Sequence, residues 1–467
     1  MWVAPLVAAA ELVVLGIDGA LKTNVESYLS ISRQSCDAQA WRVRRAYEDP
    51  QSDVRGALEP YGYYCPIVES ELEFHDDCWA ATVNVEPGPR VTWRELDIAI
   101  SGEAESDASF MQVLQASRLS PGAPLRHADW ESFNNALQAK AYERGYVEAE
   151  FLAQRVDVWP EQQAADAELR FDSGPRYLVG DIDYEQRVLT PELISAYLKL
   201  TPGLPFDNNE ISRAYRDLSD SGYFRRVEVT PAFDKAANGS IPIGVILEPA
   251  ERIEYTVGAG FATDTGPRLR GGYRNRRVNR KGHRLNVDLT VSRVISGLTA
   301  DYRQPIGDPR SDWMSYTAAI DVEDTDTFES EAGRVGVRRT RRMGTHWLRT
   351  LSIDFSYDRF MVADVRDQSR LLLPAVAFEY KRADADLYPN RGVRLSIELR
   401  AAHDALLSDT SLAQLIARGR WIHATSEHGR LLGRATVGAT AKDDFSELPP
   451  SLRFFAGGDE SIRGYDY

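Results

Sequence analysis

From residue 253 onward, hydrophobic and polar residues alternate along the chain. In 285–292, leucines and valines at odd positions face asparagine, aspartate, threonine and serine at even positions, and 351–357 and 393–399 repeat the pattern. Runs of about ten such residues have the length of strands that cross a bilayer core at a tilt. The polar faces carry Asp354 and Arg394, which a wet lumen tolerates and lipid does not. About eleven runs lie between Ile253 and Ala441. A soluble β-sandwich also alternates, but the long runs and the charged loops favour a transmembrane barrel.

The first half of the chain repeats a different pattern, in which helical spacing is followed by Gly-Tyr and an alternating strand. The glycines are separated by 83 residues (145 minus 62) and 77 residues (222 minus 145). A second landmark, an acidic small-residue turn followed by an arginine, keeps the same period at Arg90, Arg176 and Arg252. Two registers with a period of about 80 residues indicate tandem domains, because solenoid units are shorter. The first landmarks are Gly62 and Tyr63, Gly145 and Tyr146, and Gly222 and Tyr223.

Each repeated unit is predicted to run strand, helix, helix, strand, strand. In the second unit, alternation predicts strands at 92–100, 147–156 and 167–171, and helical spacing predicts helices at 110–119 and 128–143. Pro-Gly pairs at Pro121 and Pro202 punctuate the helix pairs at matching places. The predicted fold class is therefore α+β tandem domains of βααββ order, followed by an antiparallel transmembrane β-barrel.

Composition limits the classes of function. The chain has 467 residues, a net charge of -15 and a pI near 5.1, so several domains are expected and nucleic acid is disfavoured as a partner. The sequence has no apolar run long enough for a transmembrane helix, and its mean hydropathy is -0.38. Barrel strands escape both tests because every second residue is polar. Residues 1–10 form a short apolar run without a basic flank, which we interpret as the remnant of a signal peptide.

The sequence contains little that suggests catalysis. Cys36, Cys65 and Cys78 would allow one disulfide and one remaining thiol in an oxidising compartment, and their spacing does not fix the pair. A metal site at His75 and Cys78 is an alternative to an acidic turn between two strands. The seven histidines have no ligand spacing and no nucleophile lies in a recognisable setting, so we predict no metal, no cofactor and no enzymatic activity.

The last stretch, 453–467, reads Arg-Phe-Phe-Ala-Gly-Gly-Asp-Glu-Ser-Ile-Arg-Gly-Tyr-Asp-Tyr. It resembles the signature of the BamA/TamA superfamily of outer-membrane assembly barrels and two-partner secretion exporters, roughly Phe-x-x-Gly-Gly-x-x-Ser-x-Arg-Gly-Tyr/Phe. In that family the segment is a loop that folds back into the barrel lumen, where its arginine bonds to the inner wall. A glycine-rich turn or a weak anion-binding nest is the alternative. The motif residues are Gly457, Gly458, Ser461, Arg463, Gly464 and Tyr465.

Two further resemblances support the same family. Pro389 and Gly392 form a Pro-x-x-Gly turn that enters a strand where family barrels carry one, although ordinary hairpins have such turns too. The βααββ repeat resembles the POTRA domain. The resemblance implies POTRA-like domains at 11–89, 90–175 and 176–252, and a partial barrel at 253–467 whose lumen loop is 442–467. Family barrels close with about sixteen strands, because an open edge in lipid is costly, so we expect further strands after Tyr467.

Three POTRA-like units most resemble the TamA branch, the outer-membrane subunit of the translocation and assembly module. This resemblance implies an outer-membrane barrel with periplasmic POTRA domains that helps insert autotransporters and other barrel proteins. It implies unfolded outer-membrane proteins as substrates, a TamB-like periplasm-spanning partner and contact with outer-membrane lipid. The alternatives are a two-partner export pore, a BamA-type central insertase and a passive porin, although porins lack POTRA domains.

The expected mechanism is strand templating at a weak seam. A nascent strand could pair with the first barrel strand, 253–261, while it is still hydrated, so that its backbone is never unsatisfied in lipid. Glycines in this strand would weaken local pairing. The expected seam residues are Tyr255, Val257, Gly258 and Gly260. A second docking edge is 225–229 in the third unit, although this segment could equally complete a small sheet.

Overall fold

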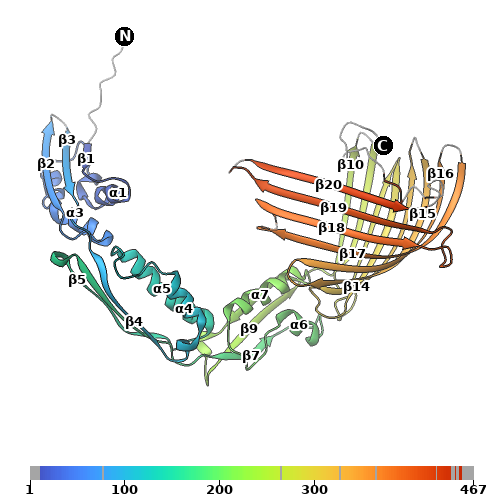
Figure 1. Ribbon diagram of the computed structural model, residues 1–467, viewed down its shortest axis with the longest axis horizontal. Coiled ribbons are helices and arrows are strands. Elements are labelled where there is room, and N and C mark those ends of the chain that lie inside the picture. Colours follow the sequence, from blue (N-terminus) through green and yellow to red (C-terminus); the bar gives the residue numbers. More distant parts are fainter. Residues whose placement is uncertain are drawn as a thin grey trace, which may run out of the picture. The chain divides into compact units, whose positions relative to one another are not determined.

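The structure is a computed structural model (Figure 1). It describes residues 11–75, 78–262, 266–325, 328–362, 365–385, 387–426, 429–442, 448 and 452–454. The chain forms two compact units. One unit holds the chain up to Asp181, together with Thr201–Asn209 and Ala232–Pro242. The other holds Ile182–Leu200, Glu210–Pro231 and the chain from Ile243. Each unit is described by itself.

The first sheet has the strand order β1-β3-β2, with β1 parallel and β2 antiparallel to β3. Three helices accompany it, and Val25, Val54 and Leu58 from them share a core with Val83 and Val85 of β3. A disulfide joins Cys36 to Cys78, whereas Cys65 is free and exposed, which confirms the prediction of one bridge and one thiol. Cys78 is therefore not available as a metal ligand. The elements are β1 (Glu11–Leu15), α1 (Gly19–Tyr28), η1 (Ser30–Arg33), α2 (Ala40–Ala46), α3 (Pro50–Leu58), η2 (Glu59–Tyr61), β2 (Ile67–His75) and β3 (Cys78–Glu86).

The second sheet, β4-β6-β5, confirms the predicted βααββ order. Trp93, Phe110, Phe133 and Phe171 lie in its core. Several predicted bounds are wrong, and the strand expected at 167–171 covers Ala164–Asp172. The helix expected to reach residue 119 ends at Ala116, and the strand expected from residue 147 begins at Glu150, because residues 147 and 148 form a turn after the helix end at Gly145. The elements are β4 (Thr92–Ser101), η3 (Glu103–Ser106), α4 (Ala108–Ala116), α5 (His127–Arg144), β5 (Glu150–Trp159), η4 (Pro160–Gln162) and β6 (Ala164–Asp172).

The third sheet, β7-β9-β8, follows the same order of elements, and the division between the two compact units passes through this part of the chain. Its first helix begins at Pro191 with the Thr190 hydroxyl accepting from the Leu193 amide, which is a standard N-cap. The elements are β7 (Leu178–Tyr184), α6 (Pro191–Leu198), α7 (Asn208–Asp220), β8 (Phe224–Pro231), η5 (Phe233–Lys235) and β9 (Ser240–Pro249).

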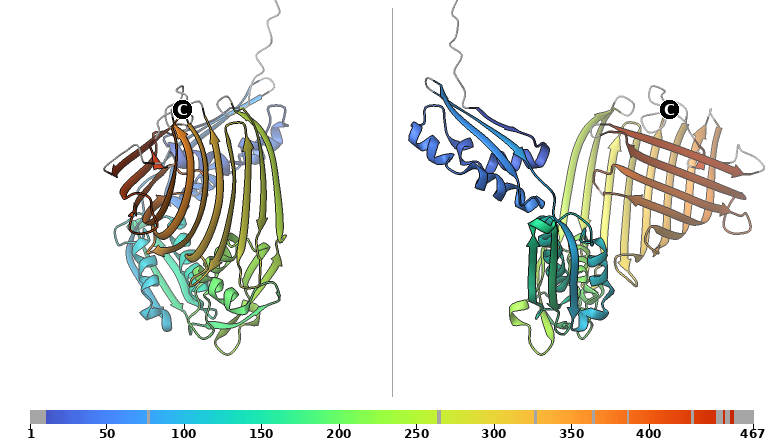
Figure 2. Two further views of the ribbon diagram at one scale, coloured as in Figure 1. Left: turned by 90° about the vertical axis from the view of Figure 1, so that its right-hand side faces the viewer. Right: turned by 60° about the vertical axis from the view of Figure 1, so that its left-hand side comes forward.

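Among the described residues, the remaining strands form one antiparallel sheet of eleven strands in chain order, which confirms the predicted number and topology. They lie side by side in a curved wall (Figure 2). Three strands are longer than the predicted length of about ten residues. They are β15, β16 and β17, which have 16, 16 and 19 residues. The strands are β10 (Ile253–Ala262), β11 (Gly266–Asn275), β12 (Arg284–Ser292), β13 (Ile295–Pro305), β14 (Asp312–Asp324), β15 (Phe328–Met343), β16 (Trp347–Val362), β17 (Val365–Ala383), β18 (Arg391–Ala402), β19 (Leu412–Ala424) and β20 (Arg430–Ala441).

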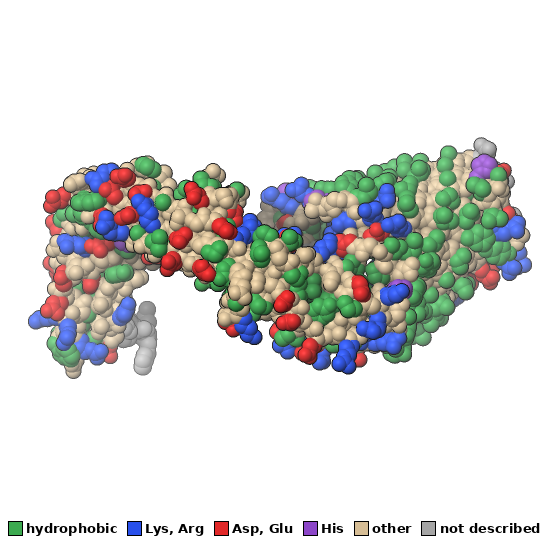
Figure 3. Space-filling view, turned by 90° about the horizontal axis from the view of Figure 1, so that it is seen from below, with side chains coloured by type: hydrophobic (Ala, Val, Ile, Leu, Met, Phe, Trp, Pro, Cys, Tyr) green, Lys and Arg blue, Asp and Glu red, His purple; other side chains and the backbone are tan. Residues whose placement is uncertain are grey.

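The two faces of this sheet differ in chemistry. One face carries ion pairs and amides, such as the Arg338–Asp354 pair at 3.0 Å and the buried Gln414. The other exposes apolar side chains, which cover much of the outside of the sheet in Figure 3. This is the division that a lipid-facing wall around a polar lumen requires. No helix in the described residues is long and apolar enough to cross a membrane. The exposed apolar residues include Tyr255, Val257, Leu269, Leu289, Ile320, Val335, Ile353, Leu399, Leu415 and Val437.

Candidate functional site

The first barrel strand, β10, forms one end of the eleven-stranded sheet. It pairs with β11 without interruption from Ile253 opposite Asn275 to Ala262 opposite Gly266. Its other edge has no strand partner among the residues that the structure describes. The side chains of Tyr255, Val257 and Phe261 are 73%, 88% and 74% exposed, so the outward face of this strand is an open apolar surface.

Gly258 and Gly260 lie on the inward face of β10, where they alternate with the outward residues. Arg270 and Arg268 stand opposite them on β11. A Cβ on Gly258 would meet nothing within 4 Å, whereas one on Gly260 would lie 3.3 Å from Nε of Arg268. The ladder to β11 is regular through both glycines. The two glycines leave the inward side of the backbone without side chains. Because glycine loses more conformational entropy than other residues when it is ordered, they weaken this part of the strand.

The two repeated landmarks of the first half meet in space. Nε of Arg90 donates a hydrogen bond to the carbonyl oxygen of Tyr61 at 2.9 Å, and Nε of Arg176 donates to that of Arg144 at the same distance. Each acceptor directly precedes the landmark glycine. The next amide along, Val91 or Tyr177, donates to the glycine carbonyl at 2.9 Å in both cases. The two landmarks recur with one period because the same two hydrogen bonds join them in each of these domains. We call this pair of hydrogen bonds, from the landmark arginine and from the amide after it, the clamp.

The landmark glycines are required by conformation and by space. Gly62 and Gly145 have φ of +90° and +85° and end the helices before them. This left-handed conformation favours glycine. A Cβ on Gly145 would also lie 2.8 Å from Cβ of Phe206, and one on Gly62 would lie 2.5 Å from the carbonyl oxygen of Leu125. Only glycine lets the following segment approach this closely.

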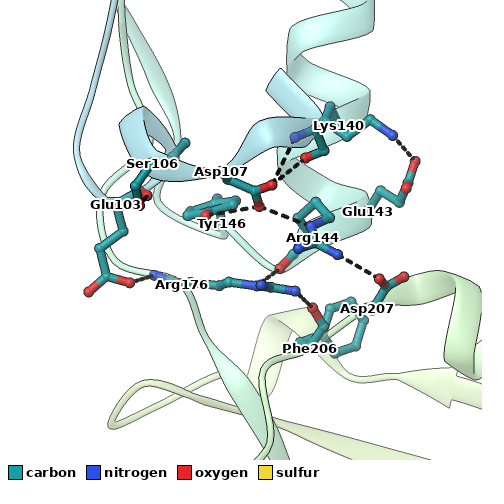
Figure 4. Close-up of polar contacts among 12 residues, drawn as sticks. Glu103, Ser106, Asp107, Lys140, Glu143, Arg144, Tyr146, Arg176, Phe206 and Asp207 are labelled. Atoms are coloured by element: carbon teal, nitrogen blue, oxygen red, sulfur yellow. Dashed lines mark hydrogen bonds and ion pairs between the residues drawn. The ribbon is translucent and has the colours of Figure 1, made fainter. Parts of the chain in front are cut away.

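A polar network surrounds the second clamp (Figure 4). The carboxylate of Asp107 accepts from Nε of Arg144 at 3.0 Å and from the hydroxyl of Tyr146 at 3.3 Å. Nη1 of Arg144 reaches Asp207 at 2.8 Å, and Nη2 of Arg176 donates to the Phe206 carbonyl at 2.8 Å. Two arginines thus tie the end of α5 to the loop before α7.

Asp107 is held ionised by its neighbours. Burial by itself would raise the pKa of its carboxyl group, but hydrogen bonds from the Ser109 backbone and hydroxyl and from Arg144 outweigh this effect and lower the pKa to about 2. The Ser109 amide and hydroxyl lie 3.0 Å and 2.8 Å from the same carboxylate oxygen. The side chain of Asp107 is 11% exposed, so solvent screens these contacts weakly.

At the third landmark, an arginine of the barrel takes the place of the repeat arginine. Gly222 again has a positive φ of +68°. The carbonyl of Ser221, which precedes it, accepts a hydrogen bond from Nη2 of Arg284 in β12, and the Arg284 guanidinium lies 4.3 Å from the centre of the Tyr223 ring. Arg252 instead donates to the carbonyl of Val278 at 3.2 Å. The start of β12 therefore binds the carbonyl that precedes the landmark glycine, as the repeat arginines do in the first two domains.

Ion pairs reinforce this attachment. Asp308, in the turn between β13 and β14, accepts from Lys199 at 2.8 Å and from Arg310, which also pairs with Asp217 of α7. The hydrogen bonds from Arg310 and Lys199 hold the pKa of Asp308 well below its usual range. The sequence showed neither Arg284 nor this group, because no motif marks residues that meet only through turn geometry.

Leucines that follow β20 in the sequence lie against the inward face of the wall. Leu448 and Leu452 are buried in one cluster with Leu371, Leu373 and Leu412. Nε2 of Gln414 donates to the Leu452 carbonyl at 2.9 Å. A Cβ on Gly438 would lie 2.1 Å from the Phe454 ring, so this glycine makes room for the ring. The lumen-loop motif, from Gly457 to Tyr465, lies outside the described residues, and so does any partner of Arg463.

The Pro-x-x-Gly turn is closed by a carboxylate. Asp384 accepts from the amides of Asn390 and Arg391 at 2.9 Å and 3.1 Å, and these hydrogen bonds, with that from Arg391 foremost, lower the pKa of Asp384. A Cβ on Gly392 would lie 3.2 Å from Ile422 and 3.3 Å from Ala383. The Pro389 carbonyl accepts from Arg430 at 3.3 Å. Within the described residues, no group of His, Cys, Asp and Glu is placed to hold a metal ion.

Comparisons with known proteins agree with this architecture. The family described as POTRA domain TamA domain 1 matches residues 11–87, and the Omp85 superfamily domain matches residues 268–467. The outer membrane protein assembly factor BamA of Nitratidesulfovibrio vulgaris is 18% identical over 421 residues, which are 87% of this chain and 52% of that protein. The chain thus spans about half the length of this curated relative.

A solved structure supports the fold. The crystal structure of BamA from Haemophilus ducreyi lacking POTRA domains 1–3 superposes with a TM-score of 0.64 at 14% identity, over 80% of this chain and 75% of that one. An arm of POTRA-type domains before an antiparallel barrel sheet defines a class of outer-membrane protein whose arm lies in the periplasm. Within this class, the chain is similar to the BamA/TamA superfamily of POTRA-plus-barrel proteins, through the family matches at residues 11–87 and 268–467 and the curated BamA relative.

Proposed function

We propose that this protein inserts or exports other outer-membrane proteins by pairing their strands with the edge of β10 that faces away from β11. The observation that carries the proposal is the make-up of this strand: Tyr255, Val257 and Phe261 are exposed on its outward face, and Gly258 and Gly260 leave its inward face bare. The 18% identity to an outer membrane protein assembly factor supports the same class of activity. The proposed activity needs no covalent bond to form or break, so we propose that the protein is not an enzyme.

The mechanism follows from the cost of unpaired backbone groups in lipid. An incoming strand cannot enter the hydrocarbon core alone, because each unsatisfied N–H or C=O group costs several kcal/mol there. Pairing with β10 satisfies these groups one by one as the strand inserts. Gly258 and Gly260 have no side chains that could hinder the exchange of one partner strand for another on the inward face. The outward side chains of β10 already face lipid before the incoming strand arrives.

The test is site-specific cross-linking in membranes. A cysteine at Thr256 of β10 is expected to form disulfides with cysteines placed along the last strand of a barrel substrate during its assembly. A cysteine at Thr299 of β13, which is paired on both sides, is the matched control. Equal cross-linking at the two positions would contradict templating. Replacement of both Gly258 and Gly260 by valine is expected to slow insertion, and an unchanged rate would remove the role given to the glycines.

We further assign the protein to the TamA type, acting on autotransporters and other barrel proteins with a TamB-like periplasmic partner. The match of residues 11–87 to the first POTRA domain of TamA supports this assignment, and so do three three-stranded sheets ahead of the barrel. The outer edge of β8, whose Arg225 and Arg226 pair with Glu248 at 3.1 Å and 3.2 Å, is the docking edge proposed for the partner. A BamA-type insertase is the second candidate, because the curated relative bears that name.

Co-purification distinguishes the two. The full-length natural protein, isolated from its own membranes after cross-linking, is expected to carry a very long periplasmic protein as its main partner. Proline at Arg225, the bulged residue of β8 that has no partner in the β8–β9 register, should weaken strand addition at this edge and abolish that association, whereas proline at exposed Arg187 in the loop after β7 should not. Absence of such a long chain among the cross-linked partners would favour the BamA type instead.

A further inference from the structure

A row of register partners crosses the outward face of the barrel wall near one end of the strands. Asp312 of β14 stands opposite Arg341 of β15, and Arg341 opposite Arg349 of β16. The row continues through Phe378 of β17 to Ile397 of β18. These are lipid-facing positions, because Ile353, Leu351 and Arg349 share one face of β16 and the first two are 50% and 44% exposed. The row therefore changes from charged to apolar within one face.

The row lies at the level of the periplasmic leaflet. The turn between β15 and β16 is at the same end of the antiparallel sheet as the start of β10, which follows the third POTRA-like domain in the chain. Outward aromatic pairs mark this end: Tyr255 with Tyr273 at 5.5 Å and Trp347 with Tyr380 at 5.1 Å between ring centres. Aromatic girdles of this kind stand at membrane–water interfaces.

The charges in this row do not balance. Arg341 and Arg349 are directly opposite each other, an arrangement that is unfavourable for like charges in a sheet. The acid beside them, Asp312, already pairs with Arg339 at 2.9 Å and lies 3.9 Å from Arg341. In the described part of the chain, Arg349 makes no hydrogen bond and no ion pair. The guanidinium groups of Arg339, Arg341 and Arg349 thus share the carboxylate of Asp312, so positive charge is in excess on this lipid-facing surface.

A hollow of about 890 Å³ adjoins these arginines. Its apolar lining comes from Met343, Trp347, Phe378 and Ile397, and its polar lining includes Arg341 and Arg349. A ligand that fits must bring an anion to one end and hydrocarbon to the other. Arginine binds phosphate oxygens with two parallel hydrogen bonds, and an acyl chain suits Phe378 and Ile397.

We propose that this hollow, defined by Arg341, Arg349, Trp347, Phe378 and Ile397, binds an anionic phospholipid of the periplasmic leaflet. The phosphodiester lies between Arg341 and Arg349, and one acyl chain runs over Phe378 and Ile397. A headgroup without an ammonium, such as phosphatidylglycerol, is preferred over phosphatidylethanolamine, because an ammonium would face two guanidinium groups. The site goes beyond the proposed function and depends only on the outer-membrane location, not on pairing at β10.

The test compares lipid retention by the full-length natural protein in nanodiscs. Discs contain phosphatidylethanolamine with a minor fraction of phosphatidylglycerol, and native mass spectrometry reports which lipid stays bound. The wild type is expected to retain phosphatidylglycerol selectively. The Arg341→Gln/Arg349→Gln double variant is expected to bind it at least about tenfold more weakly, the loss expected for one charge-assisted contact or more. Arg366→Gln, an exposed arginine at the other end of β17, is the matched control and should retain it.

Several outcomes would overturn the proposal. These are equal retention of the two lipids, unchanged retention by the double variant, and displacement of phosphatidylglycerol by inorganic phosphate at matched concentration, which would indicate a simple anion site. Heat-modifiable mobility on gels verifies that each variant is folded, and Arg349→Lys, which keeps the charge but not the two-pronged contact, should bind with intermediate strength. The cross-linking assay at Thr256 is expected to be unchanged in the double variant, so failure of this site and failure of strand templating are distinguishable.

Discussion

The hydroxyl of Tyr223 donates a hydrogen bond to the carbonyl oxygen of Gly282 at 2.6 Å. Tyr223 follows the third landmark glycine, and Gly282 lies in the turn between β11 and β12 of the barrel sheet. Nε of Arg284 donates to the same hydroxyl at 3.2 Å, and the tyrosine side chain is 1% exposed. The last POTRA-type repeat is therefore attached to the barrel through its own repeat landmark, with a barrel arginine in the place of a repeat arginine.

Removal of this hydroxyl should loosen the attachment. Tyr223→Phe leaves the Gly282 carbonyl without its buried donor, which costs roughly 1–3 kcal/mol. Hydrogen exchange is expected to accelerate in α6 and in residues 276–283. Tyr215→Phe, at a tyrosine that is 47% exposed, is the control and should leave exchange unchanged. Equal protection in the two variants would show that the hydrogen bond does not hold the turn.

Two glycines with the same backbone conformation allow the cost of backbone strain to be measured separately from the cost of a steric clash. Gly145 and Gly203 both have φ of +85°, but a Cβ on Gly145 would lie 2.8 Å from Phe206 and one on Gly203 would meet nothing within 4 Å. Gly203→Ala is expected to cost about 1–2 kcal/mol, the penalty for left-handed backbone. Gly145→Ala should cost roughly 1–3 kcal/mol more, because the clamp must open. Urea unfolding of both variants measures the difference, and equal losses would contradict the close approach.

The disulfide should stabilise the first domain. Cys36 and Cys78 are 42 residues apart, and closing a loop of this length stabilises the fold by roughly 4 kcal/mol in the chain-entropy view. Reductant, or Cys36→Ser/Cys78→Ser, is therefore expected to lower the unfolding temperature of the first domain. Cys65→Ser should change nothing, because that thiol is exposed and free. Alkylation without reductant should label a single cysteine, and labelling of three would show the bridge to be absent.

The sequence predicted the features that follow from a repeating pattern, namely the barrel strands and the tandem domains. It did not predict which residues contact each other, because those contacts depend on strand register and turn geometry. Alternation with period two predicted the barrel strands, because lipid and lumen impose opposite chemistry on successive residues such as Ile353 and Asp354. Spacing of the Gly-Tyr and arginine landmarks predicted tandem domains, since each domain needs one clamp. Neither pattern shows that Arg284 replaces Arg252 at the third clamp, because this depends on the path of the turn between β11 and β12.

Register also hid the two arginines of the proposed lipid site. Arg341 and Arg349 are eight positions apart in the sequence, and only the turn that joins β15 to β16 makes them face each other. A turn longer or shorter by one residue would offset the pair and move one of them to the other face. A similar reason applies to Leu448 and Leu452, whose burial beside Leu371 joins residues that are far apart in the sequence.

Asp107 should make the second clamp sensitive to acid. The pKa of its carboxyl group is about 2 in the folded protein against 3.8 for an ordinary aspartate. A group whose folded pKa is depressed stabilises the fold fully above its unfolded pKa and loses that contribution as pH falls toward the folded pKa. The stabilisation should therefore be complete above about pH 5, decline between about pH 4 and pH 2, and amount to about 2 kcal/mol.

The matching experiment follows unfolding of the wild type and Asp107→Asn across this pH range. The variant should be less stable at neutral pH, because Arg144 and the Ser109 amide lose the carboxylate, and the difference should shrink as pH falls toward 2. Asp129→Asn is the control, since Asp129 is 3.8 Å from Arg118 and has no comparable network. A constant difference between wild type and Asp107→Asn at every pH would mean that the residue acts through packing rather than through its charge.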